Sequence, residues 1–78
     1  MPKLIPVTAS KMMKILKQLG FEEARIKGSH HFFLHPLSRK STTIAFHSGE
    51  VLGVGILKQI LRDIDLSVYE YEKLRLQK

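Results

Sequence analysis

Residues 20–36 read GFEEARIKGSHHFFLHP, and within them the apolar pattern changes from helical spacing to strand spacing. Residues 24–27 and 31–35 alternate with a period of two, as the residues of β-strands do. The pair Gly28–Ser29 between them is typical of a tight turn, and Pro36 ends the second strand. The segment therefore predicts an antiparallel hairpin.

The segments on either side of this hairpin extend the prediction. Upstream, a helix capped by Thr8 or Ser10 runs to about Leu19, where a glycine ends it in a left-handed conformation. Its apolar stripe consists of Met12, Met13, Leu16 and Leu19. Downstream, residues 37–41 form a polar loop, and residues 42–47 are rich in β-branched and aromatic side chains, which favours a third strand.

A second long helix is expected from about Gly53 to Ile64. One face of it is apolar and consists of Val54, Leu57, Ile60, Leu61 and Ile64. Ser67 and Glu70 have the spacing of a capping box, which predicts a short C-terminal helix. The expected fold is α+β with the order α-β-β-β-α, in which a three-stranded antiparallel sheet has both long helices on one face and the other face in water.

Length and composition limit the classes of function. A chain of 78 residues predicts one small domain, residues 1–78, with no deep pocket for a cofactor. It has no cysteine, no apolar run approaching a membrane span and no secretory signal pattern, so we expect a cytoplasmic protein without a membrane partner. Thirteen Lys+Arg against seven Asp+Glu give a net charge of +6, which favours a polyanionic partner such as nucleic acid.

The clustered histidines do not have the spacing of a metal site. His30 and His31 are adjacent on a strand and point to opposite faces, so they do not readily chelate one ion. His31 and His35 share a face but lie too far apart along it for one tetrahedral ion. We expect no metal.

His30 is the candidate catalytic residue, although its residue type allows two interpretations. The structural one is a histidine at a strand end whose ring is satisfied by a backbone carbonyl. The catalytic one rests on its setting after Gly28–Ser29, where the backbone can approach a ligand, and after Arg25 and Lys27. An imidazole titrates near neutrality, so it can deprotonate a ribose 2′-hydroxyl or protonate the departing oxygen.

Other side chains also have two interpretations. Six cations could contact an RNA phosphate backbone or could simply be solvated at the surface: Arg25, Lys27, Arg39, Lys40, Lys58 and Arg62. Phosphate contact is favoured for Arg25 and Lys27, which lie next to the Gly28–Ser29 turn. Phe33 either stacks on a base or is covered by the C-terminal helix. For His47, fixing its own loop is favoured over contacting RNA.

The stretches GFEEARIKGSHHFFLHP, FHSGE and GILKQILRDIDLSVYEY together resemble the HicA family, the toxins of HicA–HicB toxin–antitoxin pairs. The resemblance spans nearly the whole chain. It implies a fold like that of a double-stranded-RNA-binding domain and metal-independent endonucleolytic cleavage of mRNA. The histidine of the Gly-Ser-His motif, here His30, is then the catalytic residue, and a HicB-type antitoxin is expected to cover it and the basic face.

The predicted RNA-binding residues are Arg25, Lys27, Gly28, Ser29, Arg39 and Lys40. Gly28 and Ser29 are included because they match the family motif, and the four cations because of their charge. The chain departs from the family pattern at Ala45, where many members have Pro, and at Ile56, where many have Thr and so one more hydroxyl for RNA. A competing hypothesis is a noncatalytic RNA-binding module with the same fold. It accounts for the charge and the strands but leaves the Gly-Ser-His placement accidental.

Overall fold

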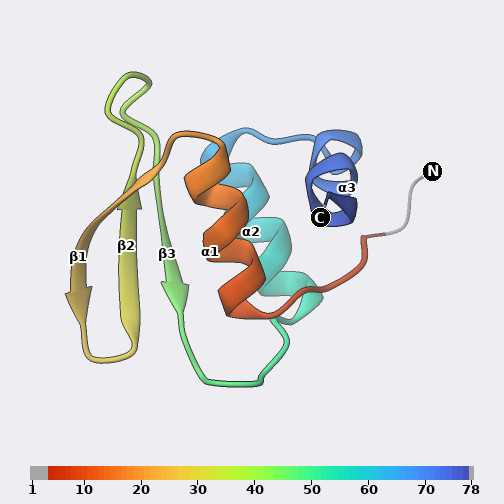
Figure 1. The fold of residues 1–78 in the computed structure, drawn as a ribbon, viewed down its shortest axis with the longest axis horizontal. Coiled ribbons are helices and arrows are strands. Elements are labelled where there is room, and N and C mark those ends of the chain that lie inside the picture. Colours follow the sequence, from red (N-terminus) through yellow and green to blue (C-terminus); the bar gives the residue numbers. More distant parts are fainter. Residues whose placement is uncertain (1–3, 78) are drawn as a thin grey trace.

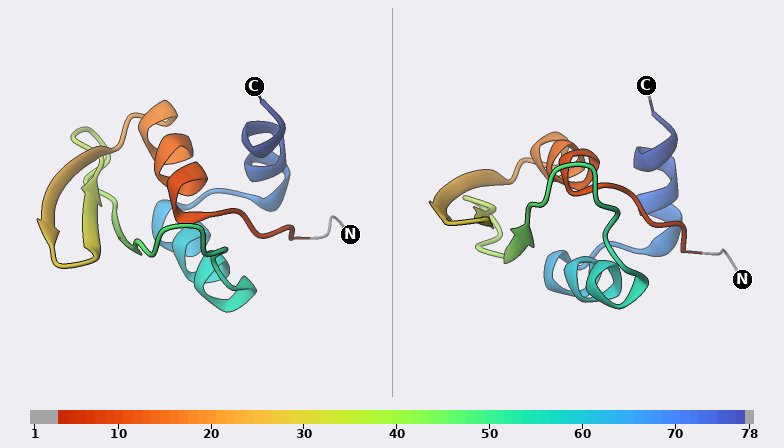
Figure 2. Two further views of the ribbon diagram at one scale, coloured as in Figure 1. Left: turned by 60° about the horizontal axis from the view of Figure 1, so that its bottom comes forward. Right: turned by 90° about the horizontal axis from the view of Figure 1, so that it is seen from below.

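The computed structural model describes residues 4–77. Its elements are, in chain order, α1 (Ala9–Gln18), β1 (Glu22–Lys27), β2 (His30–Leu34), β3 (Ser41–Ala45), α2 (Val54–Ile64) and α3 (Val68–Leu76). The strands form one antiparallel sheet in the order β1-β2-β3. The helices α1 and α2 lie side by side between this sheet and α3 (Figures 1 and 2). The predicted α+β fold and its element order are confirmed.

The core lies between the sheet and the two long helices. Phe33 and Ile44 project from the helix-covered face of the sheet and are only 1% and 0% exposed. They meet a buried set from the helices that includes Met12, Ile15, Leu16, Leu57, Ile60 and Leu61. All six residues of β1 are exposed, because β1 is the edge strand farthest from the helices (Figure 1). None of the helices within residues 4–77 covers the opposite face of the sheet (Figure 2).

The limits of α1 follow from its capping residues. The Thr8 side chain accepts a hydrogen bond from the backbone N–H of Lys11 at 3.2 Å, so Thr8, and not Ser10, is the N-cap. At the other end Gly20 has φ +97°, and Phe21 N–H donates to the Leu16 carbonyl at 2.9 Å, the long bond of a Schellman motif. The helix therefore ends where the sequence predicts.

The apolar stripe of α1 differs from the predicted one. The residues buried on this helix are Ala9, Met12, Ile15 and Leu16, whereas Met13 and Leu19 are only partly buried. Ile15 joins the core because α1 is covered on two sides, by the sheet and by α3, which widens the buried arc beyond one narrow stripe (Figure 2).

The predicted apolar face of α2 is confirmed at Leu57, Ile60, Leu61 and Ile64. The prediction is wrong for Val54, which is 42% exposed. Val54 is the first residue of the helix, and the first turn extends past the edge of the packed core. Gly53 caps this end without any side-chain hydrogen bond.

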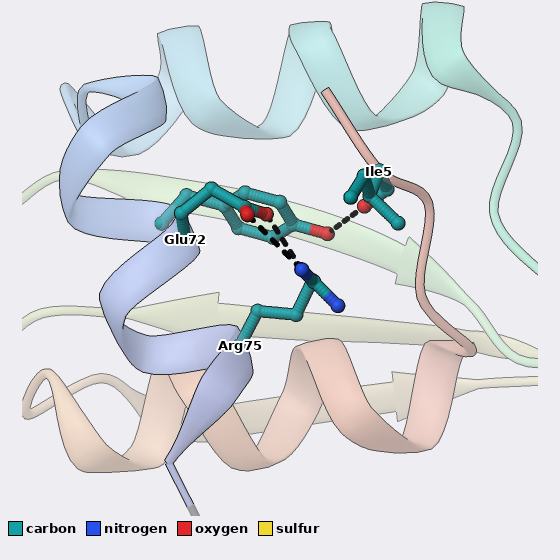
Figure 3. A network of polar contacts seen from close by, with 4 residues as sticks. Ile5, Glu72 and Arg75 are labelled. Carbon is teal, nitrogen blue, oxygen red and sulfur yellow. Dashed lines mark hydrogen bonds and ion pairs between the residues drawn. The ribbon is translucent and has the colours of Figure 1, made fainter. Parts of the chain in front are cut away.

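The predicted C-terminal helix is present and holds the N-terminal segment against the core. Ser67 is its N-cap and accepts a hydrogen bond from Glu70 N–H at 3.1 Å. The Tyr71 side chain is fully buried and its hydroxyl donates to the Ile5 carbonyl (Figure 3). This burial raises the pKa of Tyr71 to about 12. A contact between residues 66 positions apart thus joins the two ends of the chain.

The strand limits differ slightly from those predicted. β1 begins at Glu22 and not at Ala24, β2 begins at His30 and not at His31, and β3 ends at Ala45 and not at His47. The alternation of side chains along one strand does not place its ends, because a ladder stops where the neighbouring strand no longer offers hydrogen-bonding partners.

Candidate functional site

His30 lies at the turn end of the sheet, on the face that the helices do not cover. The ladder pairs it with Lys27 on β1 and with Ala45 on β3. Gly28 in the preceding turn has φ +60°, a conformation that glycine adopts without the cost other residues meet. The Ser29 carbonyl accepts a hydrogen bond from Phe46 N–H at 2.7 Å, so this end of the hairpin is joined to the end of β3. His30 is therefore presented by a fixed backbone.

The two adjacent histidines have different surroundings. The His31 ring faces the helices and binds Glu23, with Nδ1 and Oε2 2.9 Å apart, and it contacts the Phe46 ring edge-on at a centroid distance of 5.8 Å. The His30 ring is exposed, and no side-chain hydrogen bond or ion pair within residues 4–77 involves it. The interpretation of His30 as a ring satisfied by a backbone carbonyl is thus not supported, and its proton positions are open to a ligand.

No carboxylate orients the His30 ring among the described residues. Of the three candidates from the sequence, Glu23 binds His31 on the opposite face. Glu22 pairs with Leu34 at the far end of the ladder, and Glu50 lies in the loop after β3. If His30 transfers a proton, its partners are the ligand and water.

A β-bulge in β1 decides which side chains share a face with His30. The register shifts between Glu23 and Arg25, so Glu23 opposes Phe33 whereas Arg25 opposes Phe32. Residues two apart on a regular strand point to the same side, but the extra residue reverses this relation. Glu23 therefore points toward the helices, while Arg25 and, two residues later, Lys27 point to the open face beside His30.

The open face also carries an aromatic ring that the sequence analysis did not select. Phe32 projects from it, two residues after His30, and the Arg25 guanidinium carbon lies 4.9 Å from the centre of its ring. Phe33, which was considered for base stacking, is 1% exposed, so that interpretation is wrong. The sequence did contain a signal for Phe32: strand alternation places it on the same face as His30, two residues earlier.

The predicted site residues fall into two groups. Arg25, Lys27, Gly28, Ser29 and His30 are brought together at the β1–β2 turn. The others, Arg39 and Lys40, lie in the loop at the opposite end of β2 (Figure 1). Four residue steps along a strand separate the two ends by about 13 Å.

The loop that contains Arg39 and Lys40 is ordered by its own contacts. The His35 ring accepts backbone N–H bonds from Leu37 and Ser38, both at 3.2 Å from Nδ1. Lys40 forms an exposed ion pair with Asp65, with 3.2 Å between Nζ and Oδ2. This loop does not belong to the cluster around His30.

One surface hollow lies away from this cluster, and a smaller one borders it. A hollow of about 900 Å³ is a groove between α2 and α3, and Lys58 and Arg62, two of the candidate cations, line it. A smaller hollow of about 160 Å³ is lined by Ala45, the neighbour of His30 on β3, and by His47 and Glu50. Within residues 4–77, no three His, Asp or Glu side chains gather as a metal-binding cluster.

The geometry thus defines a small basic α+β protein whose sheet presents one imidazole and two cations on an uncovered face. A family model, described as the HicA toxin of bacterial toxin–antitoxin systems, matches residues 9–66. This chain belongs to the HicA toxin family. The matched region extends from α1 to the end of α2 and includes the whole sheet; α3 lies beyond it. A comparison with curated proteins found no match.

Membership of this family makes the chain the toxin of a toxin–antitoxin pair, and such a toxin has an antitoxin as its partner. Over residues 4–77, none of the helices is long and apolar enough to cross a membrane.

Proposed function

We propose that this toxin is a metal-independent endoribonuclease that cleaves mRNA in the cytoplasm and so blocks translation. The observation that carries the proposal is the position of His30. Its ring is exposed, has no partner in the described part of the chain, and is paired by the ladder with Lys27 on the open face. An unpaired imidazole beside cations is suited to proton transfer at a phosphodiester.

In the proposed reaction, the ribose 2′-oxygen attacks the adjacent phosphorus while the bond from phosphorus to the 5′-oxygen breaks. The 2′-hydroxyl loses a proton and the departing 5′-oxygen gains one. His30 carries one of these two transfers and water the other, because His30 is the one imidazole in this cluster. Lys27 and Arg25 stabilise the negative charge that develops on the phosphate oxygens. The products are a 2′,3′-cyclic phosphate and a 5′-hydroxyl.

The position of Gly28 and Ser29 supports their proposed role in binding. Gly28 has no side chain, and even an added Cβ at this position would meet no heavy atom within 4 Å, so the turn is open on this side. A backbone phosphate can therefore approach the turn closely. Arg39 and Lys40, which lie beyond the far end of β2 and so more than about 13 Å from His30, are proposed to contact RNA outside the cleavage point.

The test is cleavage of labelled single-stranded RNA by purified wild type, His30→Gln and His31→Gln. Loss of general acid–base catalysis in His30→Gln is expected to slow cleavage by about 10²–10⁴-fold. His31→Gln is the matched control, because the neighbouring ring faces the helices and not the substrate. The same sequence made of DNA lacks the 2′-hydroxyl and should remain intact. Equal cleavage by His30→Gln and wild type would contradict the proposal.

A noncatalytic RNA-binding module remains the second candidate, and one observation favours it: none of the described carboxylates orients the His30 ring. This candidate predicts that RNA binds but stays full length. In both cases affinity should fall with rising salt, with a slope of roughly 0.7 per contacted phosphate of a single strand.

The antitoxin is proposed to be of the HicB type and to cover His30 and the open face. The net charge of +6 favours an acidic contact surface on that partner. Growth arrest caused by this chain alone should be relieved when the neighbouring reading frame is expressed with it. His30→Gln should not arrest growth in either case.

A further inference from the structure

We infer that the Arg25–Phe32 pair on the open face of the sheet is a nucleobase-stacking site, so that this protein holds its RNA as an unpaired strand. One base lies against the pair, and the phosphodiester next to it lies at His30. The inference rests on the proposed ribonuclease function and adds to it the conformation of the substrate and the residues that recognise it.

The ladder places the stacking pair directly beside the catalytic pair. Arg25 and Phe32 oppose each other across β1 and β2, and the next outward-facing pair is Lys27 and His30. Successive outward-facing residues on a strand are about 7 Å apart. A base held against Phe32 therefore has its own phosphate within the reach of Lys27 and His30.

The contact between Arg25 and Phe32 prepares a flat cationic surface. The guanidinium carbon lies 4.9 Å from the centre of the ring, within the range of a cation–π interaction. Within residues 4–77, no carboxylate pairs with Arg25: Glu23 is turned to the other face by the bulge and binds His31. The guanidinium thus stays free to meet a base or a phosphate from outside.

The pair lies outside the hydrophobic core. β1 has no buried residue, and the core is formed by the opposite side chains of β2 and β3. Phe32 is only partly covered, and on this uncovered face it does not contribute to the buried core. Single-stranded RNA is recognised by stacking unpaired bases on aromatic rings or guanidinium planes, often on an open sheet.

The conformation of the RNA follows from the geometry. In a duplex each base has both faces covered by its neighbours, so it cannot stack on a protein side chain unless it is unpaired. Stacking is tolerant of base identity because every base has a π-face. We therefore expect the site to require an unpaired nucleotide and to show weak preference for its sequence.

The experiment measures binding of a short fluorescein-labelled single-stranded RNA by anisotropy at low salt, in the His30→Gln background so that the RNA stays intact. Phe32→Leu keeps the apolar bulk but removes the π-face, and it should raise the Kd by about 5- to 150-fold, the range for one stacked base. Arg25→Lys keeps the charge but removes the plane, and it should weaken binding as well.

Tyr69→Leu is the matched control, because Tyr69 is an exposed aromatic residue on α3, 69% accessible and outside the sheet. Its Kd should equal that of the background. A duplex of the same sequence should bind more weakly than the single strand. Unchanged binding in both Phe32→Leu and Arg25→Lys, or equal binding of the duplex, would overturn the inference.

Two further measurements keep the outcomes separate. Circular dichroism reports whether Phe32→Leu is folded; if it is not, Arg25→Lys decides the question, because it changes an exposed side chain. Cleavage by the wild type reports on the proposed function itself. If the wild type cuts RNA and both variants bind it normally, the stacking site is excluded but the proposed function is not. If the protein neither binds nor cuts RNA, the proposed function is excluded as well.

Discussion

Replacing Tyr71 by Phe should change both the size of the free energy of unfolding and its dependence on pH. The Tyr71 side chain is fully buried and its hydroxyl donates to the Ile5 carbonyl (Figure 3). Removing the hydroxyl leaves that carbonyl without its partner, which costs about 1 to 2 kcal/mol near neutral pH. Tyr71→Phe keeps the packing of the ring, so the hydrogen bond is the main loss.

The pH dependence follows from the pKa of Tyr71, which burial raises from 10.0 to about 12, although Arg75 opposes the shift. Below pH 10 the hydroxyl is neutral in both states, and stability does not depend on it. Between pH 10 and pH 12 the unfolded state loses its proton first, so the folded state is destabilised as the pH rises. Two pKa units correspond to about 2 to 3 kcal/mol at the end of this window.

The wild type and Tyr71→Phe should therefore converge in stability near pH 11, and the variant should be the more stable of the two at pH 12. Urea unfolding followed by far-UV circular dichroism at several pH values between 7 and 12 measures both curves. Tyr69→Phe is the control, because the ring of Tyr69 is exposed and its curve should follow the wild type. A constant difference between wild type and Tyr71→Phe over the whole range would refute the reasoning.

Three further predictions concern the scaffold and the reaction. Gly20→Ala should destabilise by about 2 to 3 kcal/mol in urea unfolding, because φ is +97° and the new Cβ would lie 2.9 Å from His35 Nε2. Gly49→Ala is the control: Gly49 has φ +79° but no atom within 4 Å of the added Cβ, so the loss in free energy of unfolding should be only about 1 kcal/mol. An equal loss in the two variants would show that the contact with His35 does not contribute. Thr42→Val should lower the urea midpoint by removing the 3.0 Å bond from the Thr42 hydroxyl to Asp63, at about 1 kcal/mol, and an unchanged midpoint would argue against that bond. Adding EDTA should leave RNA cleavage unchanged, since the proposed proton transfers need no metal; loss of cleavage would contradict this mechanism.

Local sequence signals predicted the elements well because each depends on residues close together in the chain. The helical spacing before Gly20, the positive φ of that glycine and the cap at Ser67 are all set within a few positions. The alternation after Ala24 separated His30 from His31 correctly, because successive strand residues point to opposite faces. These signals predicted the fold class and the separation of His30 and His31 onto opposite faces of the sheet.

Signals that depend on partners in space were missed or misjudged. Residue type alone does not distinguish Phe32 from Phe33, and the helices decide that Phe33 is the buried one. The Glu23–His31 contact is another such case, because a bulge in β1 brings the two side chains together. Val54 fits the apolar face of α2 by spacing, yet the core ends before it.

The amino-acid order by itself determined a basic α-β-β-β-α chain with a Gly-Ser turn followed by one histidine on each side of a strand, because side-chain direction repeats every two residues. Only the tertiary structure decided what surrounds each ring. The bulge between Glu23 and Arg25 turns the carboxylate toward His31 and the cations toward His30, and such a register shift depends on how two strands pair.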